Sequence, residues 1–466
     1  MSAAVHNVPD GPAGPPVEHS TLPDEDIDFL FRGLNSFSKL ALAVSGGADS
    51  SSLLVLFGEW MKRTSWQGGA EVVCVDHGLR PESAAEADFV AAMAADHGLP
   101  AKVLRWEGEK PTSNIQEEAR QARYLLIAGH MRQSGAQALV LAHHLDDQAE
   151  TFLDRLTRGS GLSGLGAMAC DETDGPQGLR LLRPLLSVPK TRLEASLRTR
   201  GLTWCSDPSN LDLKYKRSRL RAIMSLLAEE GLTADRLAQT AGHLRRAREA
   251  LETTLRDLVK RHVTQHPAGP LTMSREVYRA TAKDLRLRLL TGLAAGATGR
   301  RVRIRFRKLE ALDLALLAEG DCRHTLAGAL FDADRGAIRI WKEAGRTPPE
   351  TLAVTASPGV WDNRYRYWHP SDPSLPALAG NLRVGPLCRA PVQARDISWP
   401  EGWPKEAFDC SPVVWTAEGA IVASSLTAHL RIGNSDGVNS LNLERIPFQG
   451  KLEADFVDGG DLQEEI

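Results

Sequence analysis

The sequence predicts an α/β protein with a doubly wound, Rossmann-like parallel-sheet N-terminal domain, followed by a helical domain and a smaller, partly β C-terminal domain. Apolar strands alternate with amphipathic helices from residue 24 to about 205, as in parallel sheets with helices on both faces. Apolar residues recur at helical spacing from about 215 to 320. Past Pro348 the pattern changes to short β-type segments broken by Pro, Gly and Asn. We expect a disordered tail at 1–23 and domains at 24–225, 226–345 and 350–466.

The elements of the first domain follow in order along the chain. Four apolar runs predict its parallel strands: Lys39–Val44, Ala70–Val75, Ala101–Trp106 and Ala138–Ala142. Four amphipathic segments predict the connecting helices: Ser50–Lys62, Ser83–His97, a long helix from Ser113, and Asp146–Thr157. Two helix starts have capping-box spacing, Ser83 with Glu86 and Ser113 with Gln116. Ligands of such sheets bind beyond the carboxyl ends of the strands, so the residues after each strand form the candidate site.

The segment Ser45-Gly-Gly-Ala-Asp-Ser50 follows the first strand and predicts a phosphate-binding turn. Gly46 and Gly47 permit positive φ and let backbone N–H groups approach anionic oxygens at the start of the next helix. The hydroxyls of Ser45 and Ser50 add donors. Asp49 repels phosphate, so we expect it to hold a Mg²⁺ ion that bridges to the phosphates. An ordinary strand-to-helix turn with Asp49 or Ser50 as N-cap is the alternative.

The turn is neither a Walker loop nor a dinucleotide fingerprint, because it has no lysine and lacks the third glycine of G-x-G-x-x-G. Transfer of a γ-phosphate is therefore not indicated. The pattern S-G-G-x-D-S instead resembles the loop of the N-type ATP pyrophosphatases, which cut ATP between its α- and β-phosphates. This resemblance makes ATP the expected nucleotide and Mg²⁺ the expected cofactor.

A second polar cluster follows the second predicted strand. Asp76, His77 and Arg80 lie where side chains can meet a nucleotide or another polar substrate. A turn-forming aspartate and a hydrogen-bonded histidine are the alternative at this place.

A third cluster, His143-His-Leu-Asp-Asp-Gln-Ala-Glu-Thr151, follows the fourth strand. Asp147 and Glu150 are one helical turn apart near a helix N-terminus, where the dipole lowers the cost of two adjacent carboxylates. Such a pair can grip a cationic amine and accept its proton. The alternative is that Asp146 and Asp147 cap the helix and Glu150 is solvated. A metal site that includes both histidines is disfavoured, because neighbours at a strand end point in opposite directions.

Basic residues outnumber acidic ones between Arg180 and Arg221, which predicts contact with a polyanion despite the formal net charge of −3. A helix surface merely solvated by arginine is the alternative. Arg120 and Arg123 share a helix face, from which they reach the adenosine or its phosphates, or pair with Glu117.

Three other segments have ambiguous patterns. The glycine-rich stretch 159–166 predicts a flexible loop that either closes over a substrate or serves as a linker. Arg300–Lys308 and Arg364–Trp368 combine cations with apolar or aromatic residues. RNA-facing strands and half-buried strands with polar outer faces both fit that pattern.

Composition places the chain among globular proteins, with 42% hydrophobic and 25% charged residues. No apolar run approaches the roughly 20 residues that cross a bilayer, and no signal pattern opens the chain, so we expect a cytoplasmic protein. The six cysteines have no C-x-x-C spacing, which disfavours structural zinc, iron–sulfur clusters and a disulfide framework.

Seven segments in a fixed order resemble the tRNA(Ile)-lysidine synthase family within the ATP pyrophosphatases. They cover about residues 39 to 225 and read S-G-G-A-D-S (45–50), V-D-H-G-L-R-P-E-S (75–83), A-R-Q-A-R-Y (119–124), H-H-L-D-D-Q-A-E-T (143–151), R-G-S-G-L-S-G-L (158–165), L-R-P-L-L (182–186) and W-C-S-D-P-S-N (204–210). One departure is Ser218, which stands where the family usually has asparagine.

The resemblance implies an ATP-dependent carbon–nitrogen ligase. Such an enzyme adenylates the C2 oxygen of the wobble cytidine in the CAU anticodon of tRNA(Ile) and releases pyrophosphate. The ε-amine of free L-lysine then attacks C2 and AMP departs, which gives lysidine and changes decoding from AUG to AUA. No membrane partner is implied.

The site residues follow from the motifs and the basic patches. The ATP-binding candidates are Ser45, Gly46, Gly47, Ala48, Asp49, Ser50, Asp76, His77, Arg123 and His143. We expect Asp147 and Glu150 to bind lysine and to act with Asp49 in catalysis. The tRNA-binding candidates are Arg183, Lys190, Arg192, Arg217, Arg219 and Arg221, with further tRNA contacts from 226–345 and 350–466.

Two other functions remain open at this point. A tRNA thiolase of the same fold needs a persulfide cysteine or a C-x-x-C cluster near the loop, whereas Cys74 lies inside a predicted strand. A non-catalytic RNA-binding module would explain the basic patches but not the phosphate loop or the Asp147 and Glu150 pair. Consumption of ATP separates these possibilities.

Overall fold

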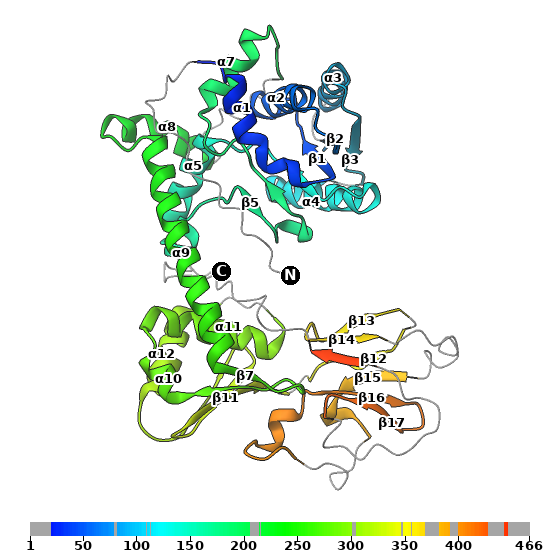
Figure 1. The fold of residues 1–466 in the computed structure, drawn as a ribbon, viewed down its shortest axis with the longest axis vertical. Helices are drawn as coiled ribbons and strands as arrows, with labels where there is room; N and C mark the ends of the chain where they lie inside the picture. The colour runs from blue at the N-terminus through cyan, green and yellow to red at the C-terminus, as the bar shows by residue number, and fades with distance from the viewer. Residues whose placement is uncertain are drawn as a thin grey trace. The chain divides into compact units, whose positions relative to one another are not determined.

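The structure is a computed structural model of the 466-residue chain (Figure 1). It describes residues 20–78, 82–108, 110–111, 113–205, 214, 216–300, 304–345, 348–355, 357–368, 382–391, 399–426 and 442–445. The predicted tail at 1–23 therefore falls almost entirely outside the described residues. The chain divides into two compact units: Met1–Arg155 with Gly166–His243, and Leu156–Leu165 with Leu244–Ile466. The expected domains at 24–225, 226–345 and 350–466 stay a prediction.

The first unit contains a six-stranded sheet in the order β3-β2-β1-β4-β6-β5. Its strands are β1 (Lys39–Ala43), β2 (Gly69–Asp76), β3 (Ala101–Arg105), β4 (Ala138–Val140), β5 (Asp171–Glu172) and β6 (Leu181–Leu182). All neighbours are parallel except β5, which pairs antiparallel with β6 at the edge. The predicted doubly wound parallel sheet is confirmed. The strands β5 and β6 escaped the sequence analysis because two residues are too few to leave a periodic pattern.

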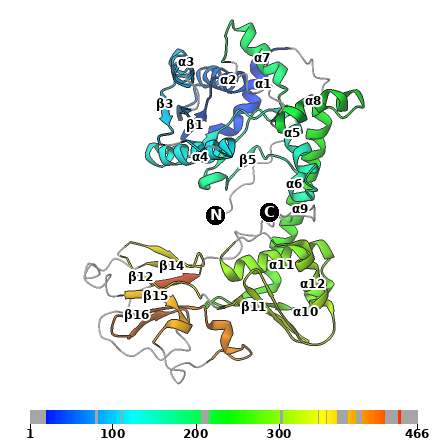
Figure 2. The ribbon, with the colours of Figure 1, turned by 180° about the vertical axis from the view of Figure 1, so that it is seen from behind.

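Helices cover both faces of this sheet (Figures 1 and 2). The helices of the first unit are α1 (Asp24–Phe31), α2 (Ala48–Thr64), α3 (Ser83–Asp96), α4 (Ile115–Ser134), α5 (Leu145–Leu156), α7 (Lys190–Thr199) and α8 (Lys216–Glu229), with 3₁₀ turns η1 (Arg32–Ser36) and η2 (Pro176–Gly178). The capping-box expectations are wrong. The N-caps are Glu82 for α3 and Asn114 for α4, and neither makes a side-chain cap hydrogen bond.

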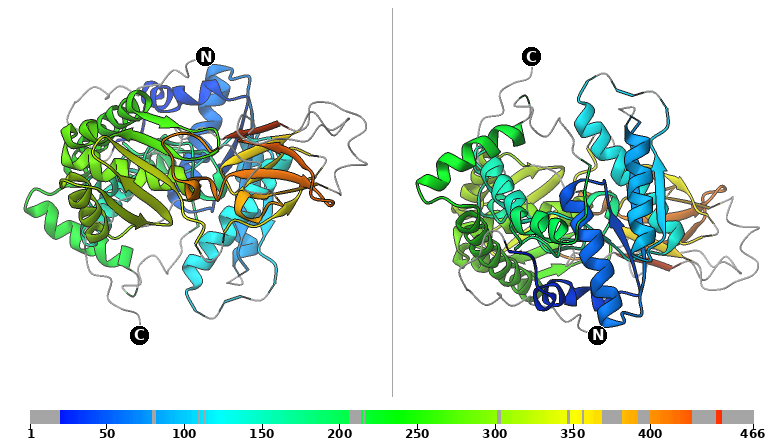
Figure 3. Two further views of the ribbon diagram at one scale, coloured as in Figure 1. Left: turned by 90° about the horizontal axis from the view of Figure 1, so that it is seen from below. Right: turned by 90° about the horizontal axis from the view of Figure 1, so that it is seen from above.

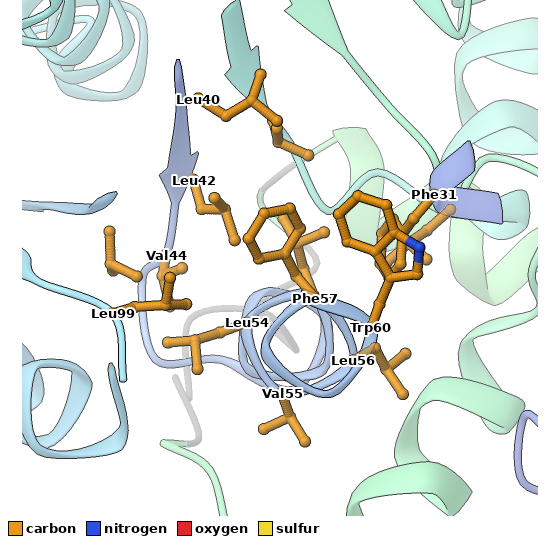
Figure 4. Packing of buried hydrophobic residues seen from close by; sticks show 14 of the residues in the cluster. Phe31, Leu40, Leu42, Val44, Leu54, Val55, Leu56, Phe57, Trp60 and Leu99 are labelled. Carbon is orange, nitrogen blue, oxygen red and sulfur yellow. The ribbon is translucent and has the colours of Figure 1, made fainter. Parts of the chain in front are cut away.

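The alternation of β1 explains the two covered faces. Leu40 and Leu42 are fully buried in the same cluster as Phe57 and Trp60 of α2 (Figure 4), whereas Ala41 is buried with residues of α4. The rings of Phe57 and Trp60 have centroids 5.4 Å apart, and Phe31 of α1 packs 5.7 Å from Trp60. This packing fixes α2, and with it the turn that precedes the helix.

The second unit begins with helices and an antiparallel sheet. Its helices are α6 (Leu162–Leu165), α9 (Ala234–His262, which crosses the unit boundary), α10 (Arg275–Ala280), α11 (Lys283–Thr298) and α12 (Phe306–Leu317). The sheet has the order β7-β8-β11-β10-β9, with β7 (Val263–Gln265), β8 (Leu271–Ser274), β9 (Cys322–Leu326), β10 (Ala329–Ala333) and β11 (Ala337–Lys342). The region expected to be helical therefore also carries strands, which are too short to interrupt the helical spacing. Residues 306–308 open α12 instead of forming an RNA-facing strand.

Short antiparallel strands follow Pro348, as predicted, and lie to one side of the green helices in Figure 3. One sheet has the order β12-β15-β16-β17, with β12 (Leu352–Ala353), β15 (Leu382–Pro386), β16 (Pro412–Thr416) and β17 (Ile421–Ser424). The other has the order β13-β14-β18, with β13 (Gly359–Trp361), β14 (Tyr365–Trp368) and β18 (Asn442–Arg445). Two 3₁₀ turns are η6 (Leu387–Arg389) and η8 (Lys405–Phe408).

The arginine-aromatic segment that contains β14 is mostly interior. Arg364, Tyr365 and Tyr367 are buried, and the Arg364 guanidinium is paired with Asp362 at 2.7 Å. Among the described side chains of residues 364–367, Arg366 is the exposed one. The alternative of a half-buried strand is therefore the one that the structure supports.

The glycine-rich stretch 159–166 is held in place rather than free. Its residues Leu162–Leu165 form α6, and the Ser163 hydroxyl accepts a hydrogen bond from Arg288 of α11 at 3.1 Å. Arg248 of α9 donates to the Ser163 carbonyl oxygen at 3.3 Å. Within the described part of the chain, no helix is both long enough and apolar enough to span a membrane.

Candidate active site

The turn between β1 and α2 has the geometry of a phosphate loop. Gly46 has φ +85°, and a Cβ there would lie 3.3 Å from the sulfur of Cys205, so the turn requires glycine at this position. The Ser50 hydroxyl accepts from the Ser45 N–H at 3.1 Å and donates to the Gly47 carbonyl oxygen at 3.1 Å. Gly47 is the N-cap of α2 and makes no side-chain cap bond. The alternative in which Asp49 or Ser50 caps the helix is thus wrong, and the helix N-terminus faces the turn with its N–H groups.

Asp49 lies in the first turn of α2 between two cations. Its Oδ2 is 3.4 Å from His144 Nε2 and 3.4 Å from Lys190 Nζ. Burial raises the pKa of Asp49, but His144 and Lys190 outweigh this effect and lower the pKa. Among the described residues, nothing forms a hydrogen bond with the buried Oδ1. An ionised carboxylate with one unsatisfied buried oxygen fits a hard cation such as Mg²⁺.

His144 lies buried among three carboxylates, those of Asp49, Asp146 and Asp147, and was absent from the predicted site. It is 1% exposed, with Nδ1 3.4 Å from Asp146 Oδ2 and Nε2 3.5 Å from Asp147 Oδ2. Burial lowers the pKa of His144, but the surrounding carboxylates raise it to about 10. The ring is therefore an imidazolium at neutral pH. A signal existed in the sequence, since an apolar strand leads into a histidine that acidic residues follow closely.

Asp147 and Glu150 of α5 face the interior together. Both are buried, with 8% and 2% of their surface exposed, so the alternative of a solvated Glu150 is wrong. Arg221 of α8 donates from Nε to Glu150 Oε1 in a short contact and from Nη2 to Oε2 at 3.4 Å. Arg217 Nε lies 3.8 Å from Oε2. Burial raises the pKa of Glu150, and Arg221 opposes this rise.

The residues after β2 lie beside α4. The Gly78 N–H donates to Asp76 Oδ1 at 2.9 Å, and hydrogen bonds from Ser83 and Gly78 lower the pKa of Asp76. The His77 ring meets the Trp106 ring edge-on, with centroids 6.0 Å apart. Burial and the charge of Arg123 lower the pKa of His77. Arg80 is outside the described residues, as are residues 206–210 of the last motif.

His143 and Arg183 meet where β4 and β6 end. Arg183 is 5% exposed, and its Nε donates to His143 Nδ1 at 3.2 Å. Burial, with Arg183, Arg217 and Arg120, lowers the pKa of His143 to about 4, against the opposing charge of Asp147. The two neighbouring histidines thus have opposite environments, although both lie beyond the end of β4.

The six basic tRNA candidates occupy different environments. Arg183 is buried, Lys190 pairs with Asp49, and Arg192 pairs with Asp26 at 3.0 Å. The other three, Arg217, Arg219 and Arg221, lie on exposed positions of α8. A tRNA contact remains a prediction for all six, although the burial of Arg183 favours an internal role.

In the part of the chain that the structure describes, no group of three or more His, Cys, Asp or Glu side chains is placed to hold a metal ion. The cysteines in this part are free thiols. Cys205 donates its N–H to the Gly46 carbonyl oxygen at 2.9 Å, which ties the last motif to the phosphate loop.

The fold and the phosphate loop define a PP-loop ATP pyrophosphatase, a class of enzyme that uses ATP. A family model described as a PP-loop domain matches residues 24–227. The chain belongs to the tRNA(Ile)-lysidine synthase family and is an enzyme of that family. This confirms the resemblance that the motifs predicted.

Curated relatives extend over most of the chain. A tRNA(Ile)-lysidine synthase from Bradyrhizobium sp. (strain BTAi1 / ATCC BAA-1182) is 40% identical over 346 residues, which are 69% of this chain and 95% of that protein. One from Ruegeria pomeroyi is 36% identical over 420 residues, which are 86% of this chain and 94% of that protein. Among solved structures, the U34-tRNA thiolase NcsA from Methanococcus maripaludis with its [4Fe-4S] cluster aligns at 17% identity and a TM-score of 0.41, over 47% of this chain and 77% of that chain.

Proposed function

We propose that this enzyme joins free L-lysine to C2 of the wobble cytidine in the CAU anticodon of tRNA(Ile). The cytidine is first adenylated with release of pyrophosphate, and lysine then displaces AMP to give lysidine. The observation that carries the proposal is that one buried imidazolium, His144, contacts both Asp49 beside the phosphate loop and Asp147 of the carboxylate pair. These two contacts support a phosphate site beside an amine site, which the two steps require.

The first step needs stabilisation of the leaving pyrophosphate. The N–H groups at the start of α2 and the Lys190 ammonium supply positive charge on the protein side. Asp49 would hold Mg²⁺, which when bound neutralises charge on the phosphates. Asp76, His77, Arg123 and His143 would line the adenosine and cytidine pockets, which agrees with their positions beyond β2, on α4 and beyond β4.

The second step needs lysine with a neutral ε-amine. Asp147 and Glu150 would bind the ammonium group and take up the proton that it must lose. Burial raises the pKa of Glu150, which favours this carboxylate as a proton acceptor. Arg221 already donates to both carboxylate oxygens of Glu150. Lysine must therefore bind this carboxylate beside the guanidinium or displace it.

The tRNA would contact the basic residues that the fold leaves exposed. Arg217 and Arg221 share the face of α8 that meets Glu150, and Arg219 is exposed on another face of the same helix. Phosphate contacts of this kind are independent of base sequence and weaken with salt. We extend the proposal to 226–345 and 350–466 as further tRNA-binding regions.

Incorporation of radiolabelled lysine into unmodified isoleucine tRNA with a CAU anticodon, with ATP and Mg²⁺, tests the proposal. We expect ATP-dependent label from the wild type and none from Asp49→Ala. Asp28→Ala is the matched control, because Asp28 is an ion-paired acid of the same unit on α1, away from the loop. If folded wild-type enzyme releases pyrophosphate but incorporates no lysine, the substrate assignment is wrong and another pyrophosphatase reaction must be sought.

A further inference from the structure

Arg183 is a buried arginine, and each of its three side-chain nitrogens donates a hydrogen bond. Besides the bond from Nε to His143 Nδ1, its Nη1 donates to the Ala169 carbonyl oxygen at 2.9 Å and its Nη2 to Glu172 Oε2 at 2.7 Å. The Arg183 N–H donates to the Cys170 carbonyl oxygen at 2.7 Å. These bonds fix the guanidinium between the β5–β6 edge of the sheet and the end of β4.

The direction of the bond to His143 determines the state of that ring. An arginine has donors but no acceptor, and it stays protonated in proteins. The partner atom Nδ1 must therefore be the acceptor and carry no hydrogen. A neutral imidazole that accepts at Nδ1 has its single hydrogen on Nε2.

We propose that Arg183 is a positioning residue that holds His143 as the neutral Nε2–H tautomer, so that this ring donates a hydrogen bond to an oxygen of the bound nucleotide or cytidine and does not take the proton from lysine. The claim about the substrate oxygen rests on the proposed function, whereas the claim about the tautomer does not. Arg183, the one tRNA candidate that lies buried, thus acts through His143 instead of through RNA.

Most of the charges around His143 also favour the neutral ring. Cations lie on α4 (Arg120), on α8 (Arg217) and beyond β6 (Arg183), whereas Asp147 of α5 favours protonation. A second proton on the ring would have to displace the Arg183 hydrogen bond and enter this positive field. The carboxylates of α5 are therefore left as the proton acceptors for lysine, and the ring as a fixed donor.

Nuclear magnetic resonance of the full chain with ¹⁵N-labelled histidine tests the tautomer directly. His143→Gln assigns the signal. In the wild type we expect an unprotonated Nδ1, a protonated Nε2 and no titration above pH about 5. In Arg183→Met we expect mixed tautomers and a pKa higher by about one unit or more. Protonated Nδ1 in the wild type, or an unchanged ring in Arg183→Met, would overturn the proposal.

Two further variants separate a specific effect from loss of structure. Arg183→Lys keeps the charge but not the directed N–H, so we expect a low pKa with mixed tautomers. Arg180→Met is the matched control, because Arg180 precedes the same strand, is 40% exposed and pairs with Asp171. It should leave the His143 signal unchanged. A change equal to that of Arg183→Met would mean that any lesion of the β5–β6 edge disturbs the ring, which contradicts the proposal.

Activity provides the second readout. Glutamine places an amide N–H near the position of Nε2 whereas asparagine does not, so His143→Gln should form lysidine about tenfold or more faster than His143→Asn. Equal loss in both variants would refute a donor at that position. If the wild type forms no lysidine, the proposed function fails, and the resonance experiment still decides the state of the ring.

Discussion

Removal of the Arg221 guanidinium should destabilise the fold, because the buried Glu150 carboxylate then loses its main charged partner. At 3.4 Å and an effective dielectric constant of about 20, the pair attracts by about 5 kcal/mol. Arg221 is 41% exposed, so solvent screens much of this attraction, while Glu150 is 2% exposed and has few other ways to be solvated. We expect Arg221→Met to lower the free energy of unfolding by about 1–3 kcal/mol at pH about 8.

The pH dependence gives this prediction its sign. Burial already raises the pKa of Glu150, and loss of Arg221 raises it further. An acid with a raised folded-state pKa destabilises the fold once the pH exceeds its unfolded-state pKa. The loss in free energy of unfolding caused by Arg221→Met should therefore be small below pH about 4, where the Glu150 carboxyl is neutral in both states. This loss should grow as the pH rises.

A double-mutant cycle with Glu150→Gln, measured by urea unfolding followed by circular dichroism, checks the assignment. The cost of Arg221→Met should shrink in the Glu150→Gln background by about 1–3 kcal/mol. Arg219→Met is the control, because Arg219 is an exposed neighbour on α8, and its effect should stay within about 0.5 kcal/mol. A coupling below about 0.5 kcal/mol, or a deficit independent of pH, would refute the reasoning.

Three other variants test the fold around the site. Gly46→Ala places a Cβ at φ +85° and should abolish ATP binding, as titration calorimetry would measure, whereas Gly33→Ala has open space and should leave binding intact. Trp60→Ala, which opens a cavity beside α2, should lower the free energy of unfolding by about 3–5 kcal/mol. A loss below about 1 kcal/mol would mean that the surrounding core closes the space left by the indole ring. Arg288→Met removes the donor to Ser163, so limited proteolysis should cut residues 159–166 faster; unchanged cleavage would show that other contacts hold α6.

Local sequence signals were enough to predict the strands β1 to β4 and the phosphate loop. A buried apolar run, two glycines and a helix determine that turn within a dozen residues, and Gly46 needs its positive φ wherever the rest of the chain lies. The short strands β5 and β6 depend on pairing partners far along the sequence, so no local period announces them. The helical spacing near residues 263–274 likewise hid β7 and β8.

The basic residues show why composition alone could not assign the site. Density of arginine predicts affinity for polyanions, yet it cannot tell which guanidinium meets solvent and which meets a buried partner. Arg183, Lys190 and Arg221 each face a titratable group of the first unit, at His143, Asp49 and Glu150. Those partners lie 40, 141 and 71 residues away in sequence, so only the fold brings the charges together.

His143 and His144 illustrate what the local sequence and the tertiary fold each contribute. Strand geometry alone predicts that adjacent side chains point in opposite directions, but it does not say what they meet. The fold places Asp49, Asp146 and Asp147 around His144, and places Arg183 against His143. One ring is therefore a buried cation that lets three acids share a small volume, and the other is held neutral three residues after the same strand. Two identical side chains, adjacent in the segment after β4, thus acquire different chemistry from the partners that the fold brings to each of them.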